Sequence, residues 1–147
     1  MSQTTIINKF GKMQGWNSIT INLLGRDVEG ITQISYNDSI EMENAYGGGK
    51  FPIGRGDGNY VAENPKLTLY KEEWDAIQSA IPPGSRVQEI EPFDVIVIYK
   101  QKSGLITKDI IRNCQFTGRG VEAAQNDKTL TYEAELICSH VDWNVVI

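Results

Sequence analysis

The segment from residue 31 to residue 44 reads ITQISYNDSIEMEN, and it decides the fold class. Its side chains alternate between apolar and polar, which is typical of a β-strand with one buried and one solvent-exposed face. The apolar positions are Ile34, Tyr36, Ile40 and Met42, and the polar ones are Gln33, Ser35, Asn37, Ser39, Glu41 and Glu43. We predict a single strand of about 14 residues, roughly 45 Å long.

The same alternation recurs on both sides of this segment. It predicts strands at residues 19–23, 66–70, 93–100 and 105–112, with residues 114–118 either extending the last of these or starting another. Residues 93–100 are apolar on both faces, as in a central strand that is covered on both sides. A final strand at residues 130–140 has Thr131, Glu133 and Glu135 on its polar face, and Leu130, Tyr132, Ala134, Leu136, Cys138 and His140 on the other.

A helix and a long loop complete the expected elements. Trp74, Ile77 and Ile81 repeat at helical spacing, and the Pro-Pro-Gly run at residues 82–84 ends the pattern, so we expect one helix at about 71–81. Residues 45–65 are rich in glycine and are expected to form a long loop. The whole chain, residues 1–147, then forms one mainly β domain, an antiparallel sandwich or barrel with one flanking helix.

Composition narrows the possible functions. The chain has 19 acidic and 14 basic residues and a formal charge of -5, with no cluster of basic residues that would grip phosphates. Its single histidine, His140, excludes sites that need two, and no metal or cofactor is expected. Residues 1–14 lack the apolar run of a signal peptide, and nothing in the pattern points to a membrane. Cys114 and Cys138 favour a reducing compartment, although one disulfide stays open.

Three short motifs offer alternative functions. Gly54-Arg55-Gly56-Asp57-Gly58 lacks the strand-turn-helix context of a phosphate loop, and the Arg-Gly-Asp within it is expected to be a chance match to an adhesion motif. Cys138 and His140 could supply a cysteine nucleophile, but their apolar neighbours favour a core thiol beside a hydrogen-bonded histidine. We expect no enzyme activity.

Three segments resemble the central part of the tail tube proteins of long-tailed, particularly contractile, bacteriophages. They are residues 46–50 (YGGGK), 56–60 (GDGNY) and 67–74 (LTLYKEEW). The order of elements is also similar over most of the chain, whereas the residue-level match covers about 30 positions. Type VI secretion tube proteins of the Hcp kind share this architecture.

This resemblance implies a structural virion protein whose copies form stacked, hexameric rings around a conduit for DNA. Glu41, Glu43, Glu133 and Glu135 would then face the lumen, where carboxylates repel DNA phosphates. The glycines of residues 45–65, together with residues 1–16 as an N-terminal arm, would contact other subunits or rings; these glycines are Gly47, Gly48, Gly49, Gly54, Gly56 and Gly58. The partners implied are sheath, tape-measure and baseplate proteins, and the location is a virion tail assembled in the bacterial cytoplasm. The alternatives are a tail terminator, a baseplate ring protein or the tube of an injection system.

Overall fold

The computed structural model describes residues 14–100 and 104–145, so most of the expected N-terminal arm lies outside the described residues. The elements in chain order are η1 (Trp16–Ser18), β1 (Ile19–Leu23), β2 (Arg26–Val28), β3 (Ile31–Ser35), β4 (Asp38–Tyr46), β5 (Pro52–Ala62), β6 (Lys66–Tyr70), α1 (Lys71–Ser79), η2 (Val87–Glu89), β7 (Phe93–Lys100), β8 (Ile106–Phe116), β9 (Thr131–Ile137) and β10 (His140–Asp142). The prediction of a mainly antiparallel β protein with one helix is confirmed.

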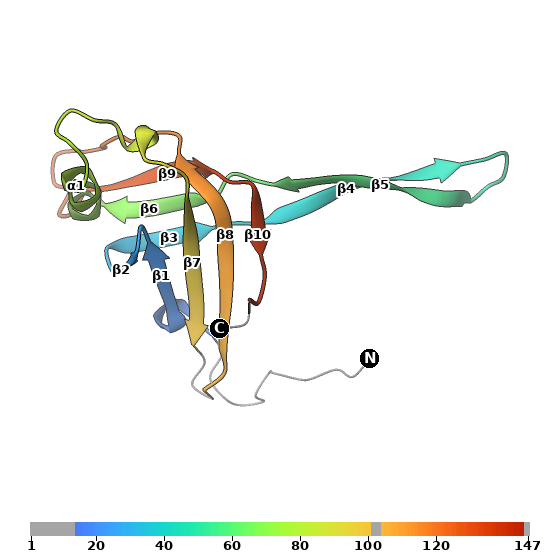
Figure 1. The fold of residues 1–147 in the computed structure, drawn as a ribbon, viewed down its shortest axis with the longest axis horizontal. Helices are drawn as coiled ribbons and strands as arrows, with labels where there is room; N and C mark the ends of the chain where they lie inside the picture. The colour runs from blue at the N-terminus through green and yellow to red at the C-terminus, as the bar shows by residue number, and fades with distance from the viewer. Residues whose placement is uncertain (1–13, 101–103, 146–147) are drawn as a thin grey trace.

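The body is a sandwich-like, strongly curled sheet in the order β2-β1-β7-β8-β9-β6-β3, with β10 paired to β8. β8 and β9 share only two register pairs, Gln115 with Ile137 and Phe116 with Leu136. At this corner the strands β3, β6 and β9 turn to run across β1, β7 and β8 (Figure 1). No ladder closes β2 onto β3 within the described part of the chain, so the body is an open sandwich rather than a closed barrel.

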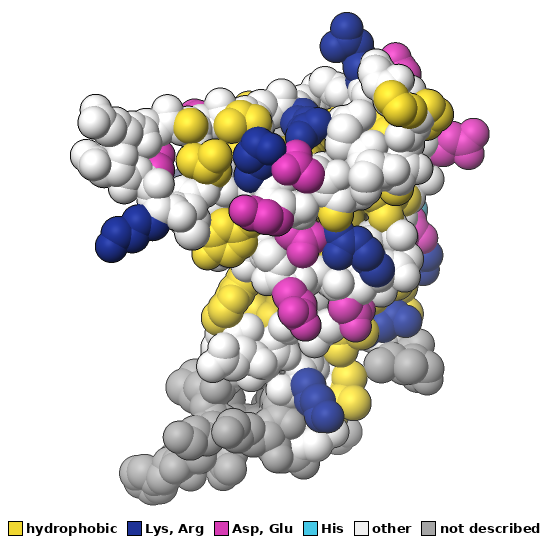
Figure 2. All heavy atoms as spheres, turned by 90° about the vertical axis from the view of Figure 1, so that its left-hand side faces the viewer, with side chains coloured by type: hydrophobic (Ala, Val, Ile, Leu, Met, Phe, Trp, Pro, Cys, Tyr) yellow, Lys and Arg dark blue, Asp and Glu magenta, His cyan; other side chains and the backbone are white. Residues whose placement is uncertain are grey.

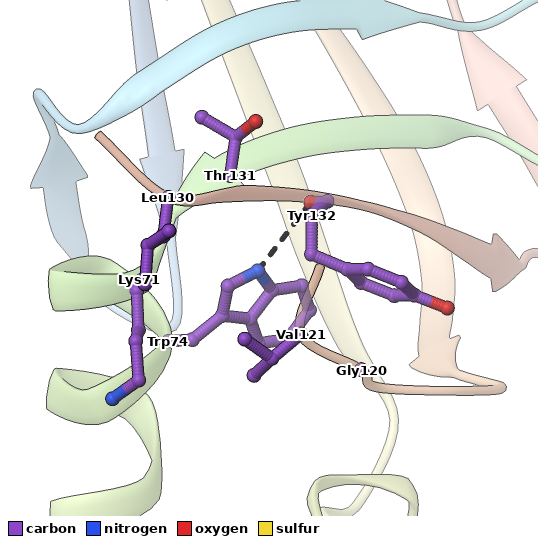
Figure 3. A pocket seen from close by; sticks show the side chains of 7 residues that line it. All are labelled: Lys71, Trp74, Gly120, Val121, Leu130, Thr131 and Tyr132. Atoms are coloured by element: carbon purple, nitrogen blue, oxygen red, sulfur yellow. Dashed lines mark hydrogen bonds between the residues drawn. The ribbon is translucent and has the colours of Figure 1, made fainter. Parts of the chain in front are cut away.

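The core lies between the layer of β3, β6 and β9 and the layer of β1, β7 and β8, and α1 closes it at one end. Trp74 and Ile77 are the buried residues of this helix. The indole of Trp74 packs 5.4 Å from the ring of Phe116 and donates a hydrogen bond to the backbone oxygen of Tyr132 (3.4 Å, Figure 3). The pocket around this indole leaves no volume for a water molecule, so it anchors the helix and offers no ligand site.

Two of the predicted long strands are each broken in two, and both predictions were wrong in this respect. Residues 31–44 divide into β3, which pairs with β6, and β4, which pairs with β5. Residues 130–140 divide after Ile137, and β10 pairs with β8 in a shifted phase that buries Val141 and exposes His140. Alternation within a segment cannot reveal such breaks, because they depend on how each half pairs with distant strands: β3 with β6 and β4 with β5, β9 mainly with β6 and β10 with β8.

The prediction of a loop at residues 45–65 was also wrong. Residues 52–62 form β5, which pairs along the length of β4 and leaves only residues 47–51 as a connection. We call β4, β5 and this connection the arm. Figure 1 shows that it extends away from the body. An arm that buries little of its surface does not need the apolar alternation that marks a core strand, so its glycines resembled a loop.

Candidate assembly surfaces

The outer surface of the three-stranded layer β3, β6 and β9 is polar. Its cross-strand neighbours are Gln33 with Thr68, Ser35 with Lys66, Thr68 with Glu133, and Lys66 with Glu135. Glu133 and Glu135 are exposed here, and Glu135 accepts a hydrogen bond from the side chain of Asn64 (2.8 Å). Lys66, which no sequence pattern singled out, lies directly opposite Glu135 and offsets one of the two negative charges on this polar face.

The other two glutamates of the expected lumen set lie elsewhere. Glu41 and Glu43 are two residues apart on β4, so they share one face of the arm, and both are exposed. The structure therefore places Glu133 and Glu135 on the body and Glu41 and Glu43 on the arm. Within one subunit the four carboxylates do not form a single site.

The arm displays large apolar side chains to solvent. Ile53 is 77% exposed and Phe51 72%. The other exposed apolar residues of the arm are Ile40, Met42, Tyr46, Tyr60 and Val61. Large apolar side chains gathered on one projecting element are typical of a surface that binds another protein.

Hydrogen bonds to Asp38 connect the base of the arm to the C-terminal part of the chain. Its Oδ2 accepts hydrogen bonds from Tyr60 Oη (2.6 Å) and from Trp143 Nε1 (3.0 Å). Tyr60 Oη in turn accepts a hydrogen bond from the backbone N–H of Val141 (3.1 Å). The hydrogen bond from Tyr60, followed by that from Trp143, lowers the pKa of Asp38.

A second cluster lies where the chain passes from β3 to the arm. Tyr36 Oη donates to Oδ2 of the buried Asp109 (2.7 Å) and is hydrogen-bonded to Tyr99 Oη, and its ring stacks on Trp143 at 5.4 Å. The backbone N–H of Asn144 donates to the other oxygen of Asp109 (3.0 Å). Burial, more than these hydrogen bonds, raises the pKa of Tyr36 well above its ordinary value. No pattern in the sequence indicates this cluster, because its members are far apart in the chain.

The six glycines proposed for assembly differ in their surroundings. A Cβ on Gly58 would lie 1.4 Å from the backbone oxygen of Glu41, at the point where the β4–β5 register shifts. Glycine is therefore required there by close packing of two backbones. A Cβ on Gly56 or Gly47 would make ordinary or slightly tight contacts, and one on Gly48, Gly49 or Gly54 would meet nothing within 4 Å.

The residues of the alternative cysteine site do not form a nucleophilic pair. Cys138 Sγ lies near the backbone oxygen of Glu63 (3.9 Å), whereas His140 is exposed and its Nδ1 is hydrogen-bonded to Ser139 Oγ (2.8 Å). Burial raises the pKa of Cys138, which opposes formation of the thiolate. His140 is hydrogen-bonded as expected, whereas Cys138 is only partly buried and packs at the edge of the core rather than within it.

Both cysteines are free thiols. Arg55, Gly56 and Asp57 lie within strand β5 rather than at a loop tip. Residues 14–100 and 104–145 contain no group of three side chains placed to hold a metal ion. Among the described helices, none has the length and apolar character needed to span a bilayer.

Solved structures with a similar fold come from contractile injection systems. A chain of the PVC sheath-tube complex of an extracellular contractile injection system is 14% identical, with 91% of this chain and 93% of that chain covered and a TM-score of 0.64. The chain shares the fold of this contractile injection system chain. A chain of the anti-feeding prophage tube terminating cap is 13% identical, with 99% of this chain and 97% of that chain covered and a TM-score of 0.63.

Hcp1 from Flavobacterium johnsoniae is 14% identical, with 85% of this chain and 93% of that chain covered and a TM-score of 0.50. The sequence matches no family model and no curated protein. At these identities the likeness concerns the fold. It confirms the predicted resemblance to tube proteins of the tail and Hcp kind at the level of architecture.

Proposed function

We propose that this protein is a structural, tube-like subunit that assembles with its own copies into rings, and that the rings stack into a conduit. The observation that carries the proposal is the arm, which projects from a body whose fold is shared with contractile injection system chains and displays seven large apolar side chains. A hydrophobic surface of this kind is stabilised when a neighbouring subunit covers it.

The polar face of the β3–β6–β9 layer is the candidate wall of the conduit. Glu133 and Glu135 stand on it beside Gln33, Ser35 and Thr68, and none of these residues offers an apolar surface to passing cargo. In a ring of several copies, the arms would add Glu41 and Glu43 to this wall. The negative charge of the four glutamates repels phosphates, so DNA would pass without being held. Lys66 reduces this repulsion without reversing it.

A tail or an injection particle is the proposed location, with assembly in the bacterial cytoplasm. The proposed partners are a sheath outside the tube, a tape-measure protein that sets its length and a baseplate at its end. The similarity to chains of a sheath-tube complex and of a tube terminating cap supports this class of assembly. Six copies per ring and DNA as the cargo are the specific forms that we propose.

Electron microscopy of the concentrated, purified protein tests the proposal. We expect rings or tubes, and a strictly monomeric protein in light scattering at all concentrations would contradict it. Glu133→Lys with Glu135→Lys should leave the rings intact while increasing their retention of DNA in low salt. Glu122→Lys with Glu91→Lys, at exposed positions outside the polar face, is the control with the same change of charge.

A terminator or cap is the second candidate, and it is favoured by the match to the tube terminating cap over 99% of this chain. Both candidates require rings. A tube subunit extends its rings into tubes of variable length, whereas a terminator forms single rings that stop growth. Images of the purified protein alone distinguish these outcomes.

A further inference from the structure

The outer surface on the α1 side of the molecule carries acidic and basic side chains interspersed with one another, as Figure 2 shows. A surface of mixed charge gives no patch that would select a ligand by its charge. The corner between β8 and β9 holds a more specific chemical feature. The two cysteines of the chain, Cys114 and Cys138, both belong to this corner.

The register of the strands places Cys114 and Cys138 opposite each other. At the corner β8 and β9 pair Gln115 with Ile137 in an antiparallel ladder. One step further along this ladder, the opposite residues are the two cysteines. Beyond them, β10 pairs with β8 in the same register, so the ladders on both sides of the cysteines agree.

Both cysteine side chains lie on the core side of the corner. Cys114 is fully buried, as is Phe116 two residues further along β8. Cys138 packs against the core two residues after the buried Leu136. Because side chains two apart on a strand share a face, the two thiols face the same interior.

The hydrogen-bond pattern makes the two cysteines a close pair. The backbone N–H of Thr117 donates to the backbone oxygen of Glu135 (3.2 Å), which marks these two residues as a hydrogen-bonded pair. Hydrogen-bonded and non-hydrogen-bonded pairs alternate, so Cys114 and Cys138, three steps away, form a non-hydrogen-bonded pair. Opposite Cα atoms in such a pair are about 4.5 Å apart, and a disulfide spans Cα separations of about 4.4–6.8 Å.

The reduced thiols have weak contacts that oxidation could replace. Cys114 Sγ donates to the backbone oxygen of Ile111 (3.3 Å), and Cys138 Sγ lies 3.9 Å from the backbone oxygen of Glu63. A thiol is a weak donor, so rotation of the two side chains toward each other gives up little. Burial, followed by the proximity of Cys138, raises the pKa of Cys114 to about 12, which keeps the reduced pair slow to react.

We propose that Cys114 and Cys138 are a redox-sensitive pair that forms an intramolecular disulfide when the protein meets a low-molecular-weight disulfide as oxidant. The partly exposed Cys138 loses its proton to solvent and attacks one sulfur of the oxidant, whose S–S bond breaks and releases the first small thiolate. Cys114 then loses its proton, its sulfur attacks Cys138 Sγ, and the second small thiolate leaves. The protein loses two electrons and two protons, and the oxidant is reduced to two thiols.

This disulfide fastens the corner at which the two layers of the body join. The ladder between β8 and β9 consists of two register pairs, so a covalent bond adds a third connection beside them. Cys138 also lies beside Glu63, the residue that follows the last residue of β5, so the bond forms next to the base of the arm. The pair is reduced in a reducing compartment and oxidised in an oxidising one.

Oxidised glutathione is the probe that tests the pair. Native protein in glutathione buffers of rising oxidised fraction should lose both free thiols and the mass of two hydrogen atoms. Trypsin should then release two linked peptides, which begin at Asn113 and Thr129. The urea midpoint of the oxidised protein should be higher by about 1 M or more, because the bond restricts the unfolded chain, and a reductant should reverse this shift.

Ile137→Cys in a Cys138→Ser background is the matched control. It moves the thiol by one residue to the opposite face of the strand, where Ile137 is 52% exposed. This variant should take up one glutathione and keep the Cys114 thiol free. An internal disulfide that forms equally well in this variant would contradict the argument from the register.

Two results with the wild-type protein would overturn the proposal. One is a mixed disulfide between Cys138 and glutathione that persists without an internal link. The other is the absence of the internal link after refolding from urea in the same buffers, because refolding removes the limit set by access to the buried Cys114. The internal disulfide can be measured in a monomer, so its failure leaves the tube-like function standing, and the absence of rings leaves the redox pair standing.

Discussion

The indole Nε1 of Trp143 donates a hydrogen bond to the carboxylate of Asp38 across 3.0 Å. This contact joins the C-terminal part of the chain to the first residue of β4. The Trp143 ring also stacks on Tyr36, which precedes the arm and is held by Asp109. A single tryptophan therefore bridges the two polar clusters that fix where the arm leaves the body.

The carboxylate of Asp38 gives this anchoring a pH dependence. The pKa of Asp38 is lowered from its ordinary value of 3.8 in the folded protein. The stabilisation that the Asp38 carboxylate provides through its hydrogen bonds is therefore complete above pH 3.8 and is lost as the pH falls through the lowered pKa. We expect the NMR signal of the Trp143 indole N–H to shift in this acid range. Asp38→Asn should remove the titration, and a shift that persists in this variant would assign it to another group.

Gly58→Ala should disrupt the arm. The added Cβ would overlap the backbone oxygen of Glu41, so the register of β4 and β5 must shift. Amide hydrogen exchange of the arm should become faster while that of the body is unchanged. Gly54→Ala is the matched control, since a Cβ there meets nothing, and equal behaviour of the two variants would contradict the role assigned to Gly58.

Trp74→Ala should destabilise the body by about 3–5 kcal/mol, the usual cost of removing a buried aromatic side chain. Trp74 is 1% exposed and packs against Phe116 and Tyr132. Urea unfolding followed by circular dichroism measures the loss. Trp16→Ala, at a tryptophan that is 46% exposed, should change the free energy of unfolding by less than about 1 kcal/mol.

The native thiols should react slowly with a disulfide reagent at pH 8. Burial raises the pKa of Cys114 to about 12, so its thiolate is scarce at this pH, and the side chain is fully buried. Cys138 is partly exposed and should react first, though more slowly than a thiol in denaturant. Rapid reaction of native Cys138 would instead support the alternative cysteine site.

Elements that bury one face could be predicted closely from the sequence. The strands at residues 66–70 and 93–100 have the predicted boundaries, and the helix begins at Lys71 as expected and ends at Ser79. In the first strand and the helix the apolar side chains follow the period of the element, because one face packs into the core. The strand at 93–100 was recognised by its continuous apolar run instead, and its Val95 and Val97 are buried while Ile96 and Ile98 are partly buried. The helix ends two residues earlier than predicted, within the usual uncertainty at a terminus.

The arm could not be predicted in this way. Its strands pair only with each other, and Ile40, Met42 and Ile53 are exposed, so no burial pattern distinguished β5 from a loop. The four glutamates that we expect to face a lumen each lie on a strand, as predicted. That Glu41 and Glu43 are separated from Glu133 and Glu135 depends on the break between β3 and β4.

The sequence alone determined the class of the fold, because alternation and helical spacing record which side chains a local segment buries. Tertiary structure alone decided where the long strands break, that Lys66 faces Glu135, and that Tyr36, Asp109 and Trp143 meet. These features depend on contacts between distant segments. Such contacts leave no periodic trace in the chain, since each partner fixes the other only after the sheets have packed.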